Sequence, residues 1–435
     1  MMPHLLYNAR LVCPERGIQE QGWLVTDNGL IEATSFDHDS FDDSITDRTD
    51  CAGQIVGPGF VDMRVQSGYP GSEHLETLES LLTAAASQGI TSLAVLPNTE
   101  PVIDNAAIID SLMLRAGGYG LSQLYCYGAM SRGLEGEQMA ELGMMSKAGA
   151  VGFANSDISI PDAQTMRRIM TYAKMFNRPV IHHCAEASLT ADTDMNEGET
   201  ATRLGLIGQP AAAETLILQR DIALAEMTGA HYHAAHISAA ASVSVIRDAK
   251  ARGVNITADT APPYFMLNEI SVSGFDSSMK LTPPLRSEDD RLAIRDGLAD
   301  GTIDAIASDH VPVDADQKTQ PFSLASAGAS ALETLVPLSL TLVRSSHLTW
   351  QQFFQRLSAA PAHILGLQAG SVRAGMPADL VQINPDTAHI INPQHFVSLS
   401  RITPFAGLPC EGRVTGCWIG GEAKLSSGAD KTGPA

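Results

Sequence analysis

The sequence predicts an α/β fold, a (β/α)8 TIM barrel joined to a composite β-sandwich domain that both termini build. Two observations indicate this fold. Eight short apolar segments alternate with helix-patterned segments through the middle of the 435-residue chain, and such units close most simply into a parallel barrel with its helices outside. Both ends of the chain instead carry short β-like pieces separated by turn signals.

An open doubly wound sheet is the alternative, because periodicity alone does not separate it from a barrel. No dinucleotide-type glycine pattern follows the first strand segment, which weakens that alternative. The expected strands are residues 54–65, 91–97, 123–128, 150–154, 179–184, 231–237, 254–258 and 304–308. The expected helices include residues 75–88, 162–176, 211–228, 241–252 and 289–298.

The two β-rich ends are expected to meet, because the termini of a domain tend to lie close together. In the first end, the apolar run Trp23-Leu-Val-Thr leads into the turn signal Asp27-Asn-Gly. The predicted domains are therefore a composite β-sandwich from residues 1–54 and 369–425 and a barrel from residues 55–368. The small, polar tail 426–435 is expected to be flexible.

Composition excludes several classes of protein. The formal net charge of −21 argues against a nucleic-acid partner or an anionic membrane surface, since neither attracts an acidic protein. No apolar run reaches the length of a membrane span, and the N-terminus lacks a basic-then-apolar signal segment. The six cysteines form no CxxC pair, which favours free thiols in a reducing cytoplasm.

Eight ordered motifs resemble those of the dihydroorotase family, within the amidohydrolase superfamily, and they cover nearly the whole chain. The first, residues 58–71, reads PGFVDMRVQSGYPG, and residues 96–101 read LPNTEP. A long segment, residues 197–214, and the motifs HAAHIS, KLTPPLR and ASDHVP follow in the family's order. The remaining two are residues 327–334 and 360–367. The resemblance implies an amidohydrolase-type barrel and an ancestry in metal-dependent hydrolysis of cyclic amides, with zinc as the family's metal.

The metal positions that the resemblance implies are only partly retained. His183, His236 and Asp309 match three of the family's ligands. The His-x-His pair at the end of the first strand is replaced by Arg64 and Gln66. A guanidinium carries a fixed positive charge and has no lone pair for a cation.

The bridging ligand of the family, a modified Lys or an Asp, aligns with Asn155. Asp157 lies two residues further along, so a shifted loop can still supply a carboxylate there. Three ligands without the bridge and the first-strand pair give at best a weak site. The cofactor prediction is therefore none.

The positions that the family uses for its substrate carboxylate have also changed. The resemblance places the clamping Arg at Gly68, an Asn at Thr282 and a His at Val313, so that only Asn98 survives of this group. Loss of a bidentate arginine weakens carboxylate recognition. The interpretation is a vestigial site with no catalytic residue, in which Asp309 and Asn98 are remnants.

Several residues also have plain structural interpretations. His231 and His233 form a His-x-His, but they open the sixth strand, whereas barrel chemistry sits at the carboxyl ends of strands. Glu186 and Glu333 are read as capping or structural carboxylates. Asp309 itself is open to a reading as a capping or ion-paired residue.

Three hypotheses for function follow. The first is a pseudoenzyme, a non-catalytic dihydroorotase-like subunit that supports aspartate carbamoyltransferase in pyrimidine biosynthesis, because the chain resembles the inactive homologue found in such bacterial assemblies. The second is an active cyclic amidohydrolase, opening a ring C–N bond at a rearranged metal site. The third is a small-molecule sensor that keeps the pocket without turnover. A homo-oligomer is expected in addition.

A structural hypothesis concerns the vacated metal site. A buried carboxylate without a counter-charge is costly, and the first strand neighbours the eighth when a barrel closes. The guanidinium of Arg64 is therefore expected to take the electrostatic place of the metal through a charge-assisted hydrogen bond to Asp309. His183 and His236 are expected to be imidazoles hydrogen-bonded to their neighbours.

Overall fold

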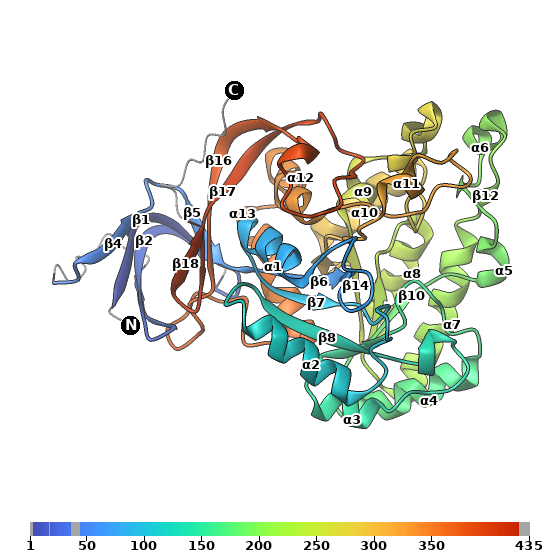
Figure 1. Ribbon diagram of the computed structural model, residues 1–435, viewed down its shortest axis with the longest axis horizontal. Helices are drawn as coiled ribbons and strands as arrows, with labels where there is room; N and C mark the ends of the chain where they lie inside the picture. The colour runs from blue at the N-terminus through green and yellow to red at the C-terminus, as the bar shows by residue number, and fades with distance from the viewer. Residues whose placement is uncertain (1–2, 17, 36–43, 426–435) are drawn as a thin grey trace.

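The computed structural model describes residues 3–16, 18–35 and 44–425, and it divides into a barrel and a sheet domain (Figure 1). The predicted flexible tail 426–435 lies outside the described residues. Eight parallel strands form the barrel in chain order, as alternating β-α units require. They are β6 (Phe60–Val65), β7 (Ile90–Val95), β8 (Gln123–Ala129), β9 (Gly152–Ala154), β10 (Val180–His183), β13 (Tyr232–Ala235), β14 (Ile256–Thr260) and β15 (Ala305–Ile306).

The barrel closes between its first and last strands just beyond β15. Val65 forms a parallel bridge with His310, and the backbone N–H of Gln66 donates to the carbonyl of His310 over 2.9 Å. This closure brings the carboxyl end of β6 beside Asp309. It therefore decides what Arg64 contacts.

Helices cover the outside of the barrel. The five that the sequence predicts are all present: α1 (Leu78–Ser87), α4 (Ala163–Lys174), α7 (Ala212–Thr228), α8 (Ala240–Ala251) and α10 (Glu288–Asp300). Capping residues start three of them, because a side-chain oxygen accepts an otherwise unpaired backbone N–H of the first turn. These caps are Thr77 for α1, Asp162 for α4 and Ser287 for α10.

The other helices lie between and after these units. They are α2 (Ala106–Gly117), α3 (Leu142–Lys147), α5 (Ala187–Thr190), α6 (Glu199–Leu204), α9 (Pro262–Met266), α11 (Ala315–Lys318), α12 (Leu332–Arg344), α13 (Trp350–Phe354) and α14 (Ala360–Leu365). A two-stranded ribbon of β11 (Met195–Asn196) and β12 (Gly208–Gln209) accompanies α5 and α6 in the long insertion after β10. No helix in the described part of the chain is both long and apolar enough to cross a bilayer.

Strands from both termini share one continuous sheet, in the order β18-β17-β16-β5-β1-β2-β3, with β4 beside β1. They are β1 (His4–Cys13), β2 (Ile18–Asp27), β3 (Leu30–Ser35), β4 (Asp47–Asp50), β5 (Ile55–Pro58), β16 (Leu380–Ile390), β17 (Pro409–Ile419) and β18 (Glu422–Leu425). The predicted fold class, a barrel with a β domain composed from both termini, is confirmed. The exact domain boundaries stay a prediction, since β5 belongs to this sheet and runs almost directly into β6.

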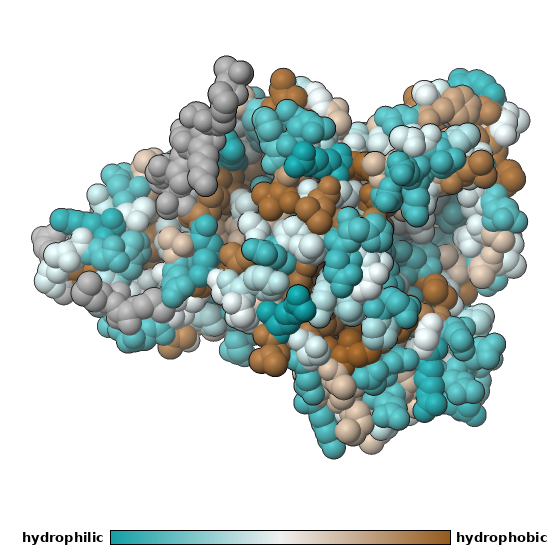
Figure 2. Space-filling view, in the orientation of Figure 1, coloured by the Kyte–Doolittle hydropathy of each residue, from teal (hydrophilic) through white to brown (hydrophobic). Residues whose placement is uncertain are grey.

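The sheet domain and the barrel form two lobes of one elongated molecule, and this face mixes hydrophilic and hydrophobic residues (Figure 2). The segment between β16 and β17 returns to the barrel. There the backbone N–H of Ser398 donates to Glu333 over 2.9 Å, and that of Leu399 donates to the buried Glu76. The structural role expected for Glu333 is therefore observed.

Candidate functional site

Arg64 is the last residue but one of β6 and lies inside the carboxyl mouth of the barrel, where only 2% of it is exposed. Its Nε donates to Oδ1 of Asp309 over 2.8 Å. Its Nη2 forms a second ion pair, with Asp157. The expected contact between Arg64 and Asp309 is therefore present, and Asp157 adds a second carboxylate that the sequence hypothesis did not include.

The charges of this group hold one another ionised. Burial alone lowers the pKa of Arg64, but Asp309 and Asp157 raise that pKa above its ordinary value. Burial likewise raises the pKa of Asp309, but His236 and Arg64 outweigh it and lower that pKa to about 2. A buried ion pair with this geometry is costly to break, because either partner alone is left as an uncompensated charge.

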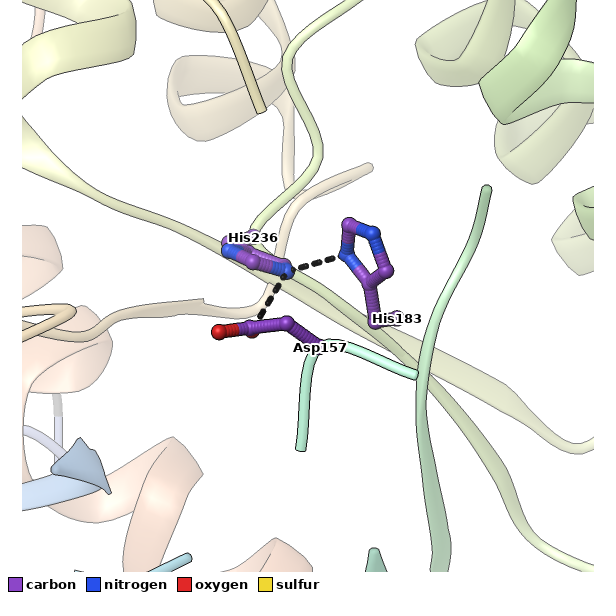
Figure 3. A group of neighbouring side chains, drawn as sticks. All are labelled: Asp157, His183 and His236. Atoms are coloured by element: carbon purple, nitrogen blue, oxygen red, sulfur yellow. Dashed lines mark hydrogen bonds and ion pairs between the residues drawn. The ribbon is translucent and has the colours of Figure 1, made fainter. Parts of the chain in front are cut away.

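The two histidines continue the network away from Arg64. Nδ1 of His183 lies 2.7 Å from Nε2 of His236, and Nδ1 of His236 lies 3.1 Å from Oδ2 of Asp309. Burial, and then the proximity of His236 and Arg64, lower the pKa of His183 well below 6.5. His183 is thus a neutral imidazole in contact with its neighbour, as the structural hypothesis expects (Figure 3).

The loop after β9 explains why Asp157 and not Asn155 enters the site. The side chain of Asn155 is buried in the loop, where it accepts from Ser131 Oγ at 2.9 Å and donates to the carbonyl of Leu134 at 3.2 Å. Ser156 has a φ of 52°, a left-handed conformation that turns the chain. Asp157 then reaches Arg64 and also accepts from Gln66 Nε2 over 3.1 Å.

Backbone strain marks the same site. His236 and Asp309 have φ values of 37° and 55°, although neither is a glycine, and such conformations persist only where the surrounding structure holds them. Both residues lie just beyond the carboxyl ends of barrel strands, where barrel enzymes place their functional groups. The backbone around these residues therefore has the strained conformations that are typical of active sites.

Asp157, His183 and His236 bring one ligand atom each to within 4.8 Å of one another, close enough to hold a metal ion together. The zinc arrangement of the family does not fit the residues around them. Arg64 binds both Asp157 and Asp309, and its fixed charge repels a dication placed between them. Both carboxylate oxygens of Asp157 already have partners, Arg64 at Oδ1 and Gln66 at Oδ2. The predicted absence of a cofactor stays a prediction.

The substrate-binding positions differ from the family pattern in shape as well as in chemistry. A Cβ atom at Gly68 would lie 2.3 Å from the carbonyl oxygen of Glu76 and 2.4 Å from that of Ser72, so no side chain fits there without backbone movement. Two cavities reach Thr282: one beside Asp309 has a volume of about 20 Å³, and one lined by Asp157 and His183 has a volume of about 300 Å³. Asn98 is exposed at the end of β7.

The remaining candidates lie outside the network. His231 and His233 both contact Thr257, at 2.8 Å each, and His233 also pairs with Asp259 at 2.8 Å. Neither forms an ion pair with Arg64, although Asp259 also accepts from the backbone N–H of His236 over 2.7 Å. Glu186 caps α5 by accepting from the backbone N–H of Ser188, in keeping with its capping interpretation.

The barrel fold, and the strained backbone at the carboxyl ends of its strands, indicate a protein of the amidohydrolase class. A family model described as Dihydro-orotase-like matches residues 53–242. A protein from Desulforapulum autotrophicum named dihydroorotase is 43% identical over 397 residues, which is 91% of this chain and 93% of that one. Another with the same name, from Pelotomaculum thermopropionicum, is 44% identical over 86% of this chain and 88% of its own length.

A solved structure, the L-hydantoinase (dihydropyrimidinase) from Arthrobacter aurescens, matches with a TM-score of 0.86 over 98% of this chain and 97% of that chain, at 23% sequence identity. It supports the fold. With the relatives above, the conclusion is plain: this chain belongs to the dihydroorotase family.

Sequence reasoning missed two participants of the network. It named Asp157 only as a possible bridging ligand, and it treated Gln66 only as a lost one. The signal for Asp157 was its place two residues after the bridging position. No signal indicated Gln66, because its contact with Asp157 depends on the path of a loop 91 residues away in the chain.

Proposed function

We propose that this dihydroorotase-family chain is non-catalytic and serves as a structural subunit that supports aspartate carbamoyltransferase in pyrimidine biosynthesis. The observation that carries the proposal is the position of Arg64. Its guanidinium, paired with Asp309 and Asp157, stands among the residues that match the metal ligands of the family. A positive charge that cannot ligate or accept a proton replaces the ion that would activate water.

The substrate side supports the same proposal. The clamp position Gly68 is sterically closed. The choice of aspartate carbamoyltransferase rests on the resemblance to the inactive homologue of such assemblies. Selection for a surface that contacts a partner explains why the barrel fold is retained in a chain that has no catalytic activity.

A second candidate function is an active cyclic amidohydrolase with a rearranged site. The names of the relatives favour it over the first, because full-length homologues at 43% and 44% identity are named dihydroorotase. The neighbouring Asp157, His183 and His236 also offer a possible single-metal site. The two candidates differ in whether ring opening takes place at all.

Metal content and turnover measured on the same preparation separate the candidates. The purified chain is incubated with excess zinc, desalted, analysed for bound metal and assayed for hydrolysis of dihydroorotate, with the Desulforapulum autotrophicum relative treated in parallel. We expect far less than one zinc per chain and no turnover above background. One retained metal per chain together with ring opening would establish the second candidate and exclude the first.

A further inference from the structure

A cavity of about 280 Å³ lies between the sheet domain and the barrel, where α12 packs against β17 and α13 packs against β1 (Figure 1). Its volume lies just below the range of drug-sized sites, which begins at roughly 300 Å³, and ligand sites occur preferentially at domain interfaces. The cavity shares no lining residue with the two cavities that reach Thr282. What it binds is therefore independent of whether ring opening takes place in the barrel.

Arg10 projects from the sheet toward the barrel, as the strand register requires. It lies opposite Ile55, and Ile55 lies opposite Ile383, on the neighbouring strands β1, β5 and β16. Partners across a sheet project to the same face, and so do alternate residues of one strand, here Arg10 and Val12. Val12, Ile55 and Ile383 share one buried core with residues of α12 and α13. The side chain of Arg10 therefore enters the cavity from the sheet side.

Two of the three charged side chains that line this cavity are unpaired within the described part of the chain. The guanidinium of the partly buried Arg10 has no hydrogen bond or ion pair there, and neither has the carboxylate of the exposed Asp386. The third, Arg344, is satisfied by Glu411 and by the carbonyl of Pro385. A partly buried cation without a counter-charge is costly. Arg10 therefore favours a ligand that carries a carboxylate.

The barrel side of the cavity is apolar and includes one aromatic ring. Leu340 and Val343 lie three residues apart on α12, so they share one face of that helix. The indole of Trp350 is held edge-on by Phe353, with ring centroids 5.6 Å apart and an interplanar angle of 73°. A ring on a ligand gains from contact with such an indole beyond the area that it buries. This wall therefore favours a flat, apolar group.

From these groups we infer that the cavity binds a free α-amino acid with an aromatic or other large apolar side chain. The carboxylate of the ligand accepts from the guanidinium of Arg10, its ammonium group faces Asp386, and its side chain lies against Trp350 and Leu340. A zwitterion meets both unpaired charges, whereas a simple anion leaves Asp386 uncompensated. A dianion such as a phosphate ester is repelled more strongly for the same reason.

Titration of the full chain, followed by ligand-observed NMR, tests the inference with L-phenylalanine and three truncated probes. Phenethylamine lacks the carboxylate, 3-phenylpropanoate lacks the ammonium group and L-alanine lacks the ring. We expect saturable binding of L-phenylalanine. Loss of the carboxylate should weaken binding by about tenfold or more, loss of the ammonium group by about two- to fivefold, and loss of the ring by at least about threefold.

Each substitution in the cavity should remove the preference for one part of the ligand. Arg10→Gln should weaken L-phenylalanine by about tenfold or more and leave the affinity for phenethylamine unchanged, because that probe has no carboxylate. Asp386→Asn should weaken L-phenylalanine by about two- to fivefold without weakening 3-phenylpropanoate. Arg247→Gln is the matched control, since Arg247 is an exposed arginine on α8 that does not line the cavity; its affinity for L-phenylalanine should equal that of the wild type.

Absence of saturable L-phenylalanine binding would overturn the inference, and so would binding of 3-phenylpropanoate that is at least as tight. Unchanged affinity for L-phenylalanine in Arg10→Gln would do the same. An equal loss for L-phenylalanine and phenethylamine in that variant would mean that Arg10 acts on the fold and not on the carboxylate, which also overturns it. None of these outcomes involves metal content or ring opening, so they are distinct from those that test the proposed function.

Discussion

Arg64 is the residue on which the interpretation of the site depends. A buried guanidinium is stable only where carboxylates surround it, and here it has Asp309 at 2.8 Å and Asp157 on its other side. Where the resemblance implies a histidine, this chain therefore has a cationic side chain of its own, paired with two carboxylates.

Arg64→Met should destabilise the fold by about 3–5 kcal/mol, because it strands the buried carboxylate of Asp309. Urea denaturation followed by circular dichroism measures the change. Arg247→Met is the control, since Arg247 is paired with Asp300 but 47% exposed, and exposed pairs contribute little. Equal stability of the two variants would show that Arg64 has no structural role.

Lowering the pH should remove the contribution of Asp309 to the free energy of unfolding, and it should do so within a defined range of pH. Its pKa is lowered from 3.8 to about 2 in the folded chain. A carboxylate whose pKa is lowered by folding adds its full stabilisation above its unfolded pKa and loses it as the pH falls through the folded value.

We therefore expect the stability difference between the wild type and Asp309→Asn to be constant near neutral pH and to shrink between about pH 4 and about pH 2. Unfolding free energies of both proteins, measured across that range, check the expectation. The comparison cancels the titration of other carboxylates. A difference that does not depend on pH would mean that Asp309 is not held ionised by its neighbours.

Restoring the family's first-strand histidines should not restore activity. The double variant Arg64→His with Gln66→His frees Asp157 from both its partners and adds two imidazoles to the site, so it should bind zinc more strongly than the wild type. Hydrolysis of dihydroorotate should stay at background, because Gly68, Thr282 and Val313 are unchanged. Metal analysis and the hydrolysis assay are run on one sample. Substantial turnover would show that the substrate site had been functional throughout.

The loop after β6 explains at the level of an element why a single substitution does not repair the substrate clamp. The backbone of residues 68–76 folds onto itself, and the N–H of Ser72 donates to the carbonyl of Gly68 over 2.6 Å. Any Cβ at Gly68 meets backbone oxygens of this loop. The loop, and not only the missing guanidinium, has to change before an arginine can point into the barrel.

Gly68→Ala should therefore cost about 1–3 kcal/mol through overpacking. Gly117→Ala is the matched control, because a Cβ there meets nothing within 4 Å at the end of α2 and alanine favours a helix by roughly 0.5–1 kcal/mol. Thermal and urea unfolding of both variants give the comparison. A neutral Gly68→Ala would indicate that the loop moves easily and that the clamp position is still accessible.

At the scale of the whole molecule, the net charge of −21 leads us to expect a partner of complementary charge and not a nucleic acid. If the proposed function holds, the chain should co-purify with aspartate carbamoyltransferase and should remain folded after metal chelation. Deleting its gene should lower carbamoyltransferase activity and leave dihydroorotase activity unchanged.

Light scattering of the isolated chain and of the mixture gives the stoichiometry, including the expected homo-oligomer. The Arg64→Met variant, if folded at low temperature, should still form the complex, since Arg64 is buried. A carbamoyltransferase of unchanged size and activity in the deletion strain would contradict the partnership.

The sequence by itself determined the family and the strand and helix order, and it placed Arg64 and Gln66 where the resemblance implies a His-x-His pair. It did so because these depend on local signals: apolar periodicity, capping residues such as Thr77 and Ser287, and ordered motifs. From Arg64 and Asp309 it also anticipated one ion pair, since barrel closure makes the first and last strands neighbours.

Only the tertiary structure decided which carboxylate completes the site and which spaces remain open. Asp157 reaches Arg64 because Ser156 turns the loop, while Asn155 is buried against Ser131. Gly68 is closed by the carbonyls of Ser72 and Glu76. Contacts of this kind join residues far apart in the chain or depend on the exact path of a loop, and neither composition nor periodicity records them.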